Sequence, residues 1–320
     1  MIALLGARGY IGSAFAEALE QREQPFLSVS RAQVDYSRFP VLLAFLRQHR
    51  PAFLINAAGF TGKPNVDACE VARGETIRGN VLLPLTVAQA CEVTGTPWGH
   101  VSSGCIYNGA KVFRSGRWTV ETELASAEFR ELRRHPENIA GFDENDTPNF
   151  TFDRPPCSFY SGTKALAEEA LGAVGPCYIW RPRMPFDERD NPRNYLTKLQ
   201  RYSRLYESTN SLSHRQDFAH ACLELWERRA PFGIYNVTNP GHVTTSEVVR
   251  LIHRVLGIER EFNFFSDDRD FYGSGVKAIR SNCILETEKL LGTGVRMRPV
   301  MDAVIDSLKR WQKAPALQVA

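Results

Sequence analysis

The first twelve residues constrain the fold of this chain more than any other segment. Four apolar residues are followed at once by the string GARGYIG, which places glycine at three evenly spaced positions: Gly6, Gly9 and Gly12. A helix is predicted next, because apolar side chains fall on one helical face: Ile11, Ala14, Phe15, Ala18 and Leu19. Glycines at this spacing let backbone N–H groups and a helix N-terminus approach a pyrophosphate closely. The segment therefore predicts a strand, a tight turn and a helix that together bind a dinucleotide.

The same alternation of a short apolar run with an amphipathic segment continues through the first half of the chain. Apolar runs occupy residues 25–30, 52–59, 98–107 and 177–182, and amphipathic segments occupy residues 41–50, 75–92 and 163–173. Strands that are apolar on both faces, each followed by a helix, are typical of a parallel sheet covered on both sides. We therefore expect an α/β fold with a Rossmann-type doubly wound parallel sheet.

The second half of the chain is predicted to be mainly helical. Helical periodicity occurs at residues 194–206, 217–228, 245–257 and 299–312, and one late strand is expected at residues 233–239. A length of 320 residues also favours a second lobe. We predict an NADP-binding domain over residues 1–182, with a returning segment near 214–238. A smaller substrate-binding lobe is predicted over residues 183–320, with ligands bound in the cleft between the two.

The stretch from about residue 110 to residue 141 breaks this pattern. It is polar and offers at most one short helix, near residues 126–135. Its basic residues are Arg114, Arg117, Arg130, Arg133 and Arg134. Long polar segments are more often solvated surface excursions than lids. We interpret this one as a surface insertion, with a substrate lid as the alternative.

Composition excludes several classes of function. The 39 basic and 36 acidic residues leave a net charge of +3, too small for a nucleic-acid or membrane surface, so the expected partner is a small molecule. Seven cysteines without a C-x-x-C pair favour a reducing compartment and no metal site. The apolar runs are too short to span a membrane, and no signal peptide is recognisable. We expect a cytoplasmic protein.

The end of the second predicted strand indicates which dinucleotide binds. An acidic residue there usually holds a ribose 2′-hydroxyl, whereas a 2′-phosphate calls for arginine. This strand ends in Ser30 and Arg31, and Arg8 lies inside the glycine turn. We expect NADPH to be preferred, with NADH as the alternative if both arginines merely face solvent. Further cofactor contacts are expected from Tyr10, Ile11, Asp35, Tyr36, Asn56, Ala57, Ala58 and Gly59.

Tyr160 and Lys164 form a candidate acid pair in the predicted helix YSGTKALAEEAL. They lie four residues apart, so both side chains project from one helical face. An ammonium beside a phenol lowers the pKa of the phenol and gives an acid that works near neutrality. Ser103, after the fourth predicted strand, lies where ligands of such sheets bind and could hold a carbonyl oxygen. A second Y-x-x-x-K, from Tyr107 to Lys111, contains a glycine and no helical pattern, so we set it aside.

These motifs together resemble the extended short-chain dehydrogenase/reductase family. They are Gly6-x-x-Gly9-x-x-Gly12, Asn56-Ala57-Ala58-Gly59, Ser103 and Tyr160-x-x-x-Lys164. Within that family the chain is similar to the bifunctional nucleotide-rhamnose synthase/epimerase-reductases, which are related to the dTDP-4-dehydrorhamnose reductases. The matching strings include FTGKPNVDACE, SSGCIY, DENDTPNF, SFYSGTKALAEE, RPRMPFDERDNPRNYLTK, GIYNVTNPG and IRSN. The resemblance spans most of the chain and leaves out residues 110–141 and 258–276.

The resemblance implies reduction of a nucleotide-linked 4-keto-6-deoxy sugar at C4, after inversion at C3 and C5. A ketone at C4 acidifies the neighbouring C–H bonds, so a base can remove each proton and an acid can return it on the opposite face. Cys105 and Lys198 match the family's epimerising pair. Strand alternation after Ser103 would also point the Cys105 thiol into the site. The alternatives are a core cysteine and a solvated lysine.

Substrate contacts are expected around the sugar nucleotide. Arg280 and Asn282 match the family's string and could engage the diphosphate or nucleotide. Arg181, Arg183 and Arg193 could do the same, with packing ion pairs as the alternative. Polar residues after the third strand are Asn65, Asp67 and Glu70, with a helix cap by Asp67 as the alternative. The expected substrate-binding set is Thr61, Asn65, Ser103, Gly104, Cys105, Tyr160, Arg183, Asn194, Lys198 and Arg280.

Two other functions stay open at this point. The first is a 4-keto reductase that acts on sugar already epimerised by a separate protein. The second is a non-catalytic NADP-binding regulatory subunit, which an intact Ser103, Tyr160 and Lys164 disfavour. The nucleotide carried by the sugar is not predicted. A homodimer is a further expectation, because helices that flank such sheets often pair.

Overall fold

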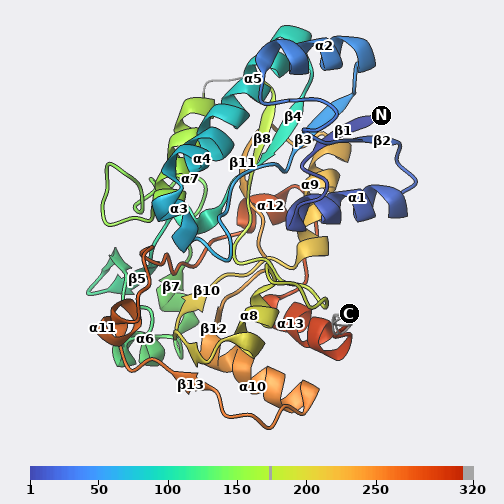
Figure 1. The fold of residues 1–320 in the computed structure, drawn as a ribbon. Helices are drawn as coiled ribbons and strands as arrows, with labels where there is room; N and C mark the ends of the chain where they lie inside the picture. The colour runs from blue at the N-terminus through green and yellow to red at the C-terminus, as the bar shows by residue number, and fades with distance from the viewer. Residues whose placement is uncertain (173–174, 313–320) are drawn as a thin grey trace.

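The computed structural model describes residues 1–172 and 175–312, and a six-stranded parallel sheet lies at its centre (Figure 1). The strands, in their order across the sheet, are β2 (Phe26–Val29), β1 (Ile2–Leu5), β3 (Phe53–Asn56), β4 (Trp98–Val101), β8 (Cys177–Arg181) and β11 (Gly233–Asn236). Every neighbouring pair is parallel. The order reverses between β1 and β3, the switch point where ligands of such sheets bind. The predicted Rossmann-type fold is confirmed.

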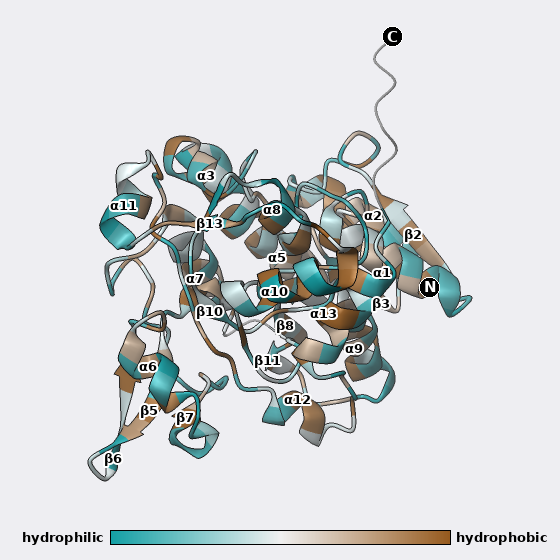
Figure 2. Ribbon diagram, turned by 90° about the horizontal axis from the view of Figure 1, so that it is seen from below, coloured by the Kyte–Doolittle hydropathy of each residue, from teal (hydrophilic) through white to brown (hydrophobic). Residues whose placement is uncertain are grey.

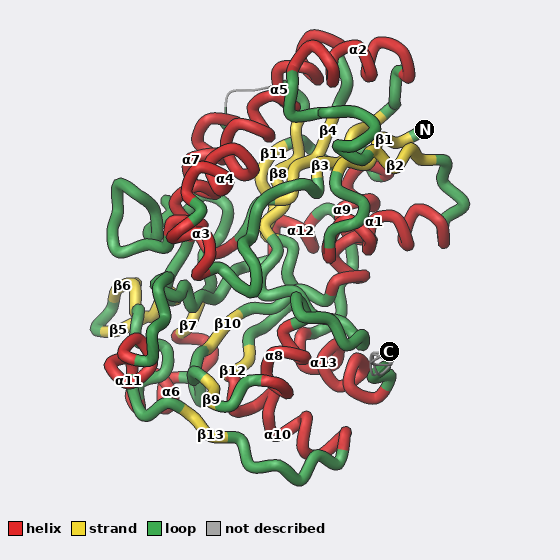
Figure 3. The backbone as a smooth tube through the Cα atoms, in the orientation of Figure 1, coloured by secondary structure: helices red, strands yellow, loops and turns green. Residues whose placement is uncertain are grey.

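Helices cover both faces of the sheet, because side chains alternate along each strand. Leu4 belongs to the cluster beneath α1 (Tyr10–Gln21), α9 (Arg215–Glu227) and α12 (Glu288–Gly292). Leu5 belongs to the opposite cluster, beneath α2 (Phe39–His49), α5 (Leu83–Thr94) and α7 (Phe159–Leu171). Figure 3 shows the strands between these two helical layers. The late strand expected at residues 233–239 is β11 and does return to the main sheet, where it pairs with β8.

The second half of the chain builds a separate hydrophobic core below the sheet. Its helices are α8 (Tyr195–Arg201), α10 (Thr245–Leu256) and α13 (Val300–Lys309), whose apolar faces meet. Smaller elements are β9 (Arg204–Leu205), paired with β13 (Asn263–Phe264), then β10 (Thr209–Asn210), paired with β12 (Val243–Thr244), and α11 (Asp268–Gly273). The helix predicted over 194–206 ends at Arg201, because the chain then enters β9. The last residues of the predicted lobe, 313–320, lie outside the described residues.

The helix predicted over residues 75–92 is divided into three parts. After α3 (Asp67–Val71), the chain forms α4 (Arg73–Ile77), a π-helical turn over Arg78–Leu82, and then α5. A π-helical turn widens the helix by one residue and often marks a functional site. Here the turn buries Asn80 completely.

Residues 110–141 form a small packed unit, so the prediction of a solvated excursion is wrong for their inner face. The elements are β5 (Ala110–Arg114), β6 (Arg117–Glu121), α6 (Ala127–Leu132), a 3₁₀ turn (Pro136–Asn138) and β7 (Ile139–Ala140). Ala110, Val112, Leu124, Phe129 and Ile284 form its core. Arg133 makes a 2.9 Å ion pair with Glu247 of α10, so the unit is fastened to the lower core. The alternation of apolar and polar side chains along β5 and β6 was not recognised in the sequence, because both strands contain arginine.

No helix in the described part of the chain combines the length and the apolar character needed to cross a bilayer.

Candidate active site

The glycine turn after β1 has the shape that a dinucleotide pyrophosphate requires. Gly6 has φ +78°, and a Cβ atom there would lie 2.7 Å from the Ala58 nitrogen. A Cβ at Gly12 would overlap the Gly6 carbonyl oxygen, so the helix can follow the strand this closely only with glycine. Helix α1 begins with Gly9 as its N-cap, without a capping side chain or an acidic residue in its first turn. Its first N–H groups are therefore open to an anion.

The expected adenosine side of the site is only partly open. Arg8 and Arg31 are exposed, as a contact to a 2′-phosphate requires. The Ser30 hydroxyl donates to Gln33, and the Asp35 carboxylate accepts from Ser37. Tyr36 does not face a ligand as expected: it is only 5% exposed and packs in the core beneath α2.

The loop after β3 is held against α7 by buried polar side chains. The Asn56 side-chain amide donates to Nδ1 of His100 over 3.2 Å, and its oxygen accepts from the Ala58 nitrogen. Asn80 accepts from the Phe60 nitrogen at 2.8 Å, donates to the Phe60 oxygen at 2.9 Å, and reaches Thr163 of α7. Asn80 and His100 were missed in the sequence. The sequence signal that could have identified Asn80 is its position next to Gly79 inside a long helical pattern.

Ser103, Tyr160 and Lys164 come together beyond the carboxyl end of β4. Tyr160 and Lys164 project from the first turns of α7, whose N-cap Ser158 accepts from the Ser161 nitrogen. Lys164 is 3% exposed and donates to the Val101 carbonyl oxygen at 3.0 Å. The Ser103 hydroxyl lies near enough to the Tyr160 phenol to influence its pKa. The arrangement places two hydroxyl donors side by side, with a lysine one helical turn away.

The pKa of Tyr160 differs in direction from the sequence prediction. Burial raises the pKa of this phenol, the nearby Cys105 thiol acts in the same direction, and the hydrogen bond to Ser103 opposes both. Burial also lowers the pKa of Lys164 to about 8, against the raising effects of Cys105 and Glu168. Lys164 is not among the groups with the largest effects on this pKa, and burial outweighs the lowering that the sequence predicted. A raised pKa keeps the phenol protonated, which suits a proton donor.

Cys105 lies in the site, but for a different reason than strand alternation. Strand β4 ends at Val101, and Ser103 caps a 3₁₀ turn over Gly104–Ile106 by accepting from the Cys105 nitrogen at 3.3 Å. A Cβ at Gly104 would lie 2.4 Å from Cδ1 of Leu285, so any larger residue would require Leu285 to shift. The Cys105 side chain is 6% exposed and close enough to Tyr160 and Lys164 to affect both of their pKa values.

Lys198, in the last turn of α8, lies in a cationic cluster with Arg193 and Arg280. Burial, Arg193 and Arg280 lower its pKa to about 8, so both protonation states are populated near neutrality. Arg193 donates to Thr61 at 2.6 Å and to the Gly62 oxygen at 2.7 Å. Arg280 makes a 2.9 Å ion pair with Asp67. Predicted residues from both halves of the chain thus meet in this cluster.

Several other predicted substrate residues are occupied by partners within the protein. Asn194 is fully buried, caps α8 through the Leu196 nitrogen, and donates to Asp187 and the Arg189 oxygen, so no polar group is left for a substrate. Arg183 donates to Asn210 and the Ser281 oxygen.

The remaining predicted residues near the third strand also have structural partners. Asn65 accepts from the Asp67 nitrogen at 2.8 Å, and Glu70 accepts from the Phe159 nitrogen at 2.7 Å. Asp67 is paired with Arg280 and does not cap a helix. Arg181 forms a buried ion pair with Glu168 at 2.6 Å, the packing alternative considered for it in the sequence.

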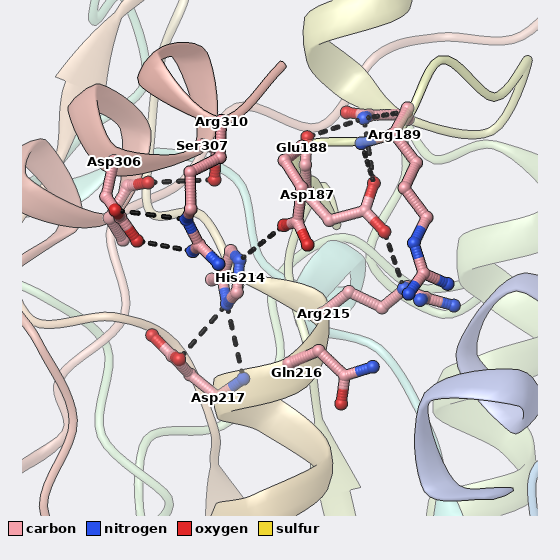
Figure 4. A network of polar contacts seen from close by, with 12 residues as sticks. Asp187, Glu188, Arg189, His214, Arg215, Gln216, Asp217, Asp306, Ser307 and Arg310 are labelled. Carbon is pink, nitrogen blue, oxygen red and sulfur yellow. Dashed lines mark hydrogen bonds and ion pairs between the residues drawn. The ribbon is translucent and has the colours of Figure 1, made fainter. Parts of the chain in front are cut away.

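A buried polar network connects the glycine turn to helix α8. Asp187 is 1% exposed, accepts from the Tyr10 phenol at 2.8 Å and from Asn194 at 2.9 Å, and pairs with Arg215 at 2.7 Å. Figure 4 shows this carboxylate beside Arg215, and His214 between Glu188 and Asp217. Tyr10 is therefore a positioning residue whose hydroxyl is already bound. The sequence indicated neither Asp187 nor His214 as part of this network.

We expect Asp187→Asn to lower the free energy of unfolding by about 3 kcal/mol, because the variant leaves a buried guanidinium partly unpaired. Affinity for the dinucleotide should fall as well, since a neutral amide oxygen accepts more weakly from the Tyr10 phenol than the carboxylate does. Urea unfolding and a fluorescence titration with NADPH measure the two effects. Asp190→Asn, in the same loop with a more exposed ion pair to Arg201, is the matched control. An equal loss of stability in both variants would contradict the assignment.

The parallel sheet, the glycine turn and the group formed by Ser103, Tyr160 and Lys164 define an extended short-chain dehydrogenase/reductase. Residues 1–284 match the family described as the RmlD substrate binding domain, and the chain belongs to this family. A bifunctional dTDP-4-dehydrorhamnose 3,5-epimerase/dTDP-4-dehydrorhamnose reductase of Arabidopsis thaliana is 32% identical over 90% of this chain and 85% of its own length.

Other relatives are longer or more distant in sequence. A trifunctional UDP-glucose 4,6-dehydratase/3,5-epimerase/reductase of Arabidopsis thaliana is 31% identical over 94% of this chain, which spans only 41% of that protein. The structure of the L780 UDP-rhamnose synthase from Acanthamoeba polyphaga mimivirus has TM-score 0.78 at 23% identity, covering 97% and 99% of the two chains. The dTDP-4-dehydrorhamnose reductase of Bacillus anthracis, in complex with NADP, has TM-score 0.74 at 18% identity, covering 97% of each chain.

Proposed function

We propose that this protein is an NADPH-dependent oxidoreductase that epimerises a nucleotide-linked 4-keto-6-deoxyglucose at C3 and C5 and reduces it at C4. The observation that carries this proposal is the position of Cys105 beside Tyr160 and Lys164. A thiol there lies next to the residues proposed to carry out the reduction. The bifunctional relative from Arabidopsis thaliana supports it. Residues 1–182 hold the cofactor and residues 183–320 supply the substrate lobe. Seven free cysteines support a cytoplasmic location.

The reduction rests on Ser103 and Tyr160. Bound NADPH supplies the hydride that C4 accepts, and NADH is the alternative donor. Ser103 and Tyr160 donate hydrogen bonds to the C4 oxygen, and Tyr160 gives that oxygen its proton as the C–O double bond is lost. Burial keeps the phenol protonated until this step. Lys164, one helical turn away, is the cation that stabilises the phenolate left behind.

The epimerisation rests on Cys105 and Lys198. One of them takes the proton from C3 or C5, the electron pair of that C–H bond moves into an enolate, and the other returns a proton to the opposite face. No net charge or electron is transferred. The pKa of about 8 at Lys198 supports this role, because the amine can then both accept and donate near neutral pH.

The cationic cluster supports a diphosphate in the substrate. Lys198, Arg193 and Arg280 are three basic residues, and within residues 1–172 and 175–312 Asp67 is the one carboxylate that forms an ion pair with them. When Lys198 is protonated, the net charge of two positive units matches a nucleoside diphosphate, and guanidinium groups bind its oxygens in pairs. Thr61 and the Gly62 carbonyl orient Arg193 for this contact.

The test is incubation with NADPH and UDP-, dTDP- or GDP-4-keto-6-deoxyglucose in heavy water. We expect oxidation of NADPH and a rhamnose-configured product that carries deuterium at C3 and C5 in its NMR spectrum. Turnover of only a ketone that was epimerised beforehand would reduce the function to a 4-keto reductase. No oxidation of NADPH with any of these sugars would favour the regulatory-subunit alternative.

A further inference from the structure

Glu168 is a buried carboxylate to which the proposed reaction gives no role. It lies on α7 one helical turn after Lys164 and is 6% exposed. A carboxylate is costly to remove from water unless it is paired. Arg181 of β8 pairs with one of its oxygens, Oε2, at 2.9 Å from Nε and 2.6 Å from Nη2. The other oxygen, Oε1, can therefore accept from a second partner.

That second partner is the end of β4. Oε1 of Glu168 accepts from the hydroxyl of Ser102, which is 2% exposed and directly precedes Ser103. One turn earlier on α7, the Lys164 ammonium donates to the carbonyl oxygen of Val101, the residue before Ser102. Two successive turns of α7 are thus joined to two successive residues at this strand end. The helix cannot slide along the strand unless both contacts break.

Arg181 is also held by groups other than Glu168. Its Nη1 donates to the Tyr107 hydroxyl at 3.1 Å, and its guanidinium carbon lies 5.3 Å from the centre of the Tyr107 ring. The Tyr107 hydroxyl donates in turn to the Asp146 carbonyl oxygen at 2.7 Å. Figure 2, like Figure 1, shows α7 on the side of the molecule that carries the β5–β6 hairpin, close to this loop. Arg181 therefore sets the orientation of the Glu168 carboxylate.

The same carboxylate acts on the charge of Lys164. Burial lowers the pKa of this ammonium, whereas Cys105 and Glu168 raise it. On β4, burial and Lys164 both lower the pKa of His100, so this imidazole is neutral and does not repel the ammonium near pH 7. A thiol attracts a cation in this way only after it has lost its proton. Glu168, in its ion pair with Arg181, therefore supplies the negative charge near neutral pH.

We propose, on the basis of the function proposed above, that Glu168 is a positioning residue of the reduction: through Ser102 it fixes Ser103 relative to α7, and it places a negative charge one turn from Lys164. Glu168 itself touches neither substrate nor cofactor, because Arg181 and Ser102 occupy its oxygens. Loss of either contribution should therefore lower kcat and leave the KM for NADPH unchanged.

Ser102→Ala tests the hydrogen bond and keeps the buried ion pair, so the variant should fold. We expect kcat for an already epimerised 4-keto sugar to fall by about tenfold, the equivalent of one hydrogen bond, with an unchanged pH profile. Ser307→Ala is the matched control, because this buried serine of α13 donates to the Ala303 oxygen at 2.9 Å in the lower core. The control should keep the wild-type kcat.

Glu168→Gln tests the charge, since the amide oxygen can still accept from Ser102. The pKa of Lys164, about 8 in the wild type, should fall by about one unit, because an opposite charge is lost. The ammonium that stabilises the phenolate is then lost at a lower pH, and kcat should decline from that pH upward. NMR of ¹³C-labelled lysine follows the same titration without substrate.

The outcomes separate the role of Glu168 from the proposed function. With an active wild type, equal kcat in Ser102→Ala and Ser307→Ala would overturn the positioning role alone. An unshifted Lys164 titration in Glu168→Gln would remove the role of the charge. If the wild type oxidised no NADPH, the proposed function and the role of Glu168 would both be wrong. Ser102→Ala is decisive even where Glu168→Gln is unstable.

Discussion

Replacing Tyr160 with phenylalanine is expected to lower kcat for ketone reduction by roughly 1,000-fold, the usual range for loss of a general acid. The variant keeps the aromatic ring of α7 and removes only the hydroxyl that faces Ser103. Binding of NADPH should change little, because the glycine turn and the loop after β3 are untouched. Stopped-flow oxidation of NADPH with an already epimerised 4-keto sugar separates this step from epimerisation.

Tyr235→Phe is the matched control for Tyr160→Phe. Tyr235 lies on the edge strand β11, and its hydroxyl donates to the Pro231 oxygen at 2.7 Å. Loss of this hydroxyl removes one hydrogen bond at the edge of the sheet. We expect full activity and a small loss of stability, about 1 kcal/mol. A loss of kcat in the control equal to that of Tyr160→Phe would point to general destabilisation and remove Tyr160 from the reaction.

The fold was predictable because its signals are local and repeated. Most strands of the central sheet are apolar on both faces, the longer helices have one apolar face, and the glycine turn marks the first strand–helix unit. The β5–β6 hairpin was not predictable in this way. The hairpin contributes only Ala110 and Val112 to the core, and its other face carries apolar side chains in solvent. Because the segment as a whole is rich in polar residues, the alternation of buried and exposed side chains could not be recognised in the sequence.

The site was predictable where the functional residues lie close together in the sequence at a recognisable spacing, as in the glycine turn and the pair Tyr160 and Lys164. Residues that act by holding others were missed. Asn80 and Asp187 bind backbone and side chains that are distant in sequence, and only the folded chain brings those partners within 3 Å. Asn194 was misassigned for the same reason, because a helix cap and a ligand contact use the same side-chain amide.

Replacing Cys105 with alanine should separate the two proposed activities. Exchange of the C3 and C5 protons should fall by at least about 100-fold, because one of the two groups that move those protons is gone. Reduction of an already epimerised ketone should persist, since Ser103, Tyr160 and Lys164 remain. NMR in heavy water measures deuterium at both carbons, and NADPH oxidation measures the reduction in the same sample.

Cys69→Ala provides the control, because it removes a second thiol that is also buried and close enough to Cys105 for the two to interact. Its proton exchange should equal that of the wild type, since Cys69 lies on α3 with Thr76 as its hydrogen-bond neighbour. Deuterium at C3 and C5 in the Cys105→Ala product at the wild-type level would exclude the thiol from the epimerisation. The proton exchange would then belong to other groups of the site, while the reductase assignment, which rests on Tyr160, would stand.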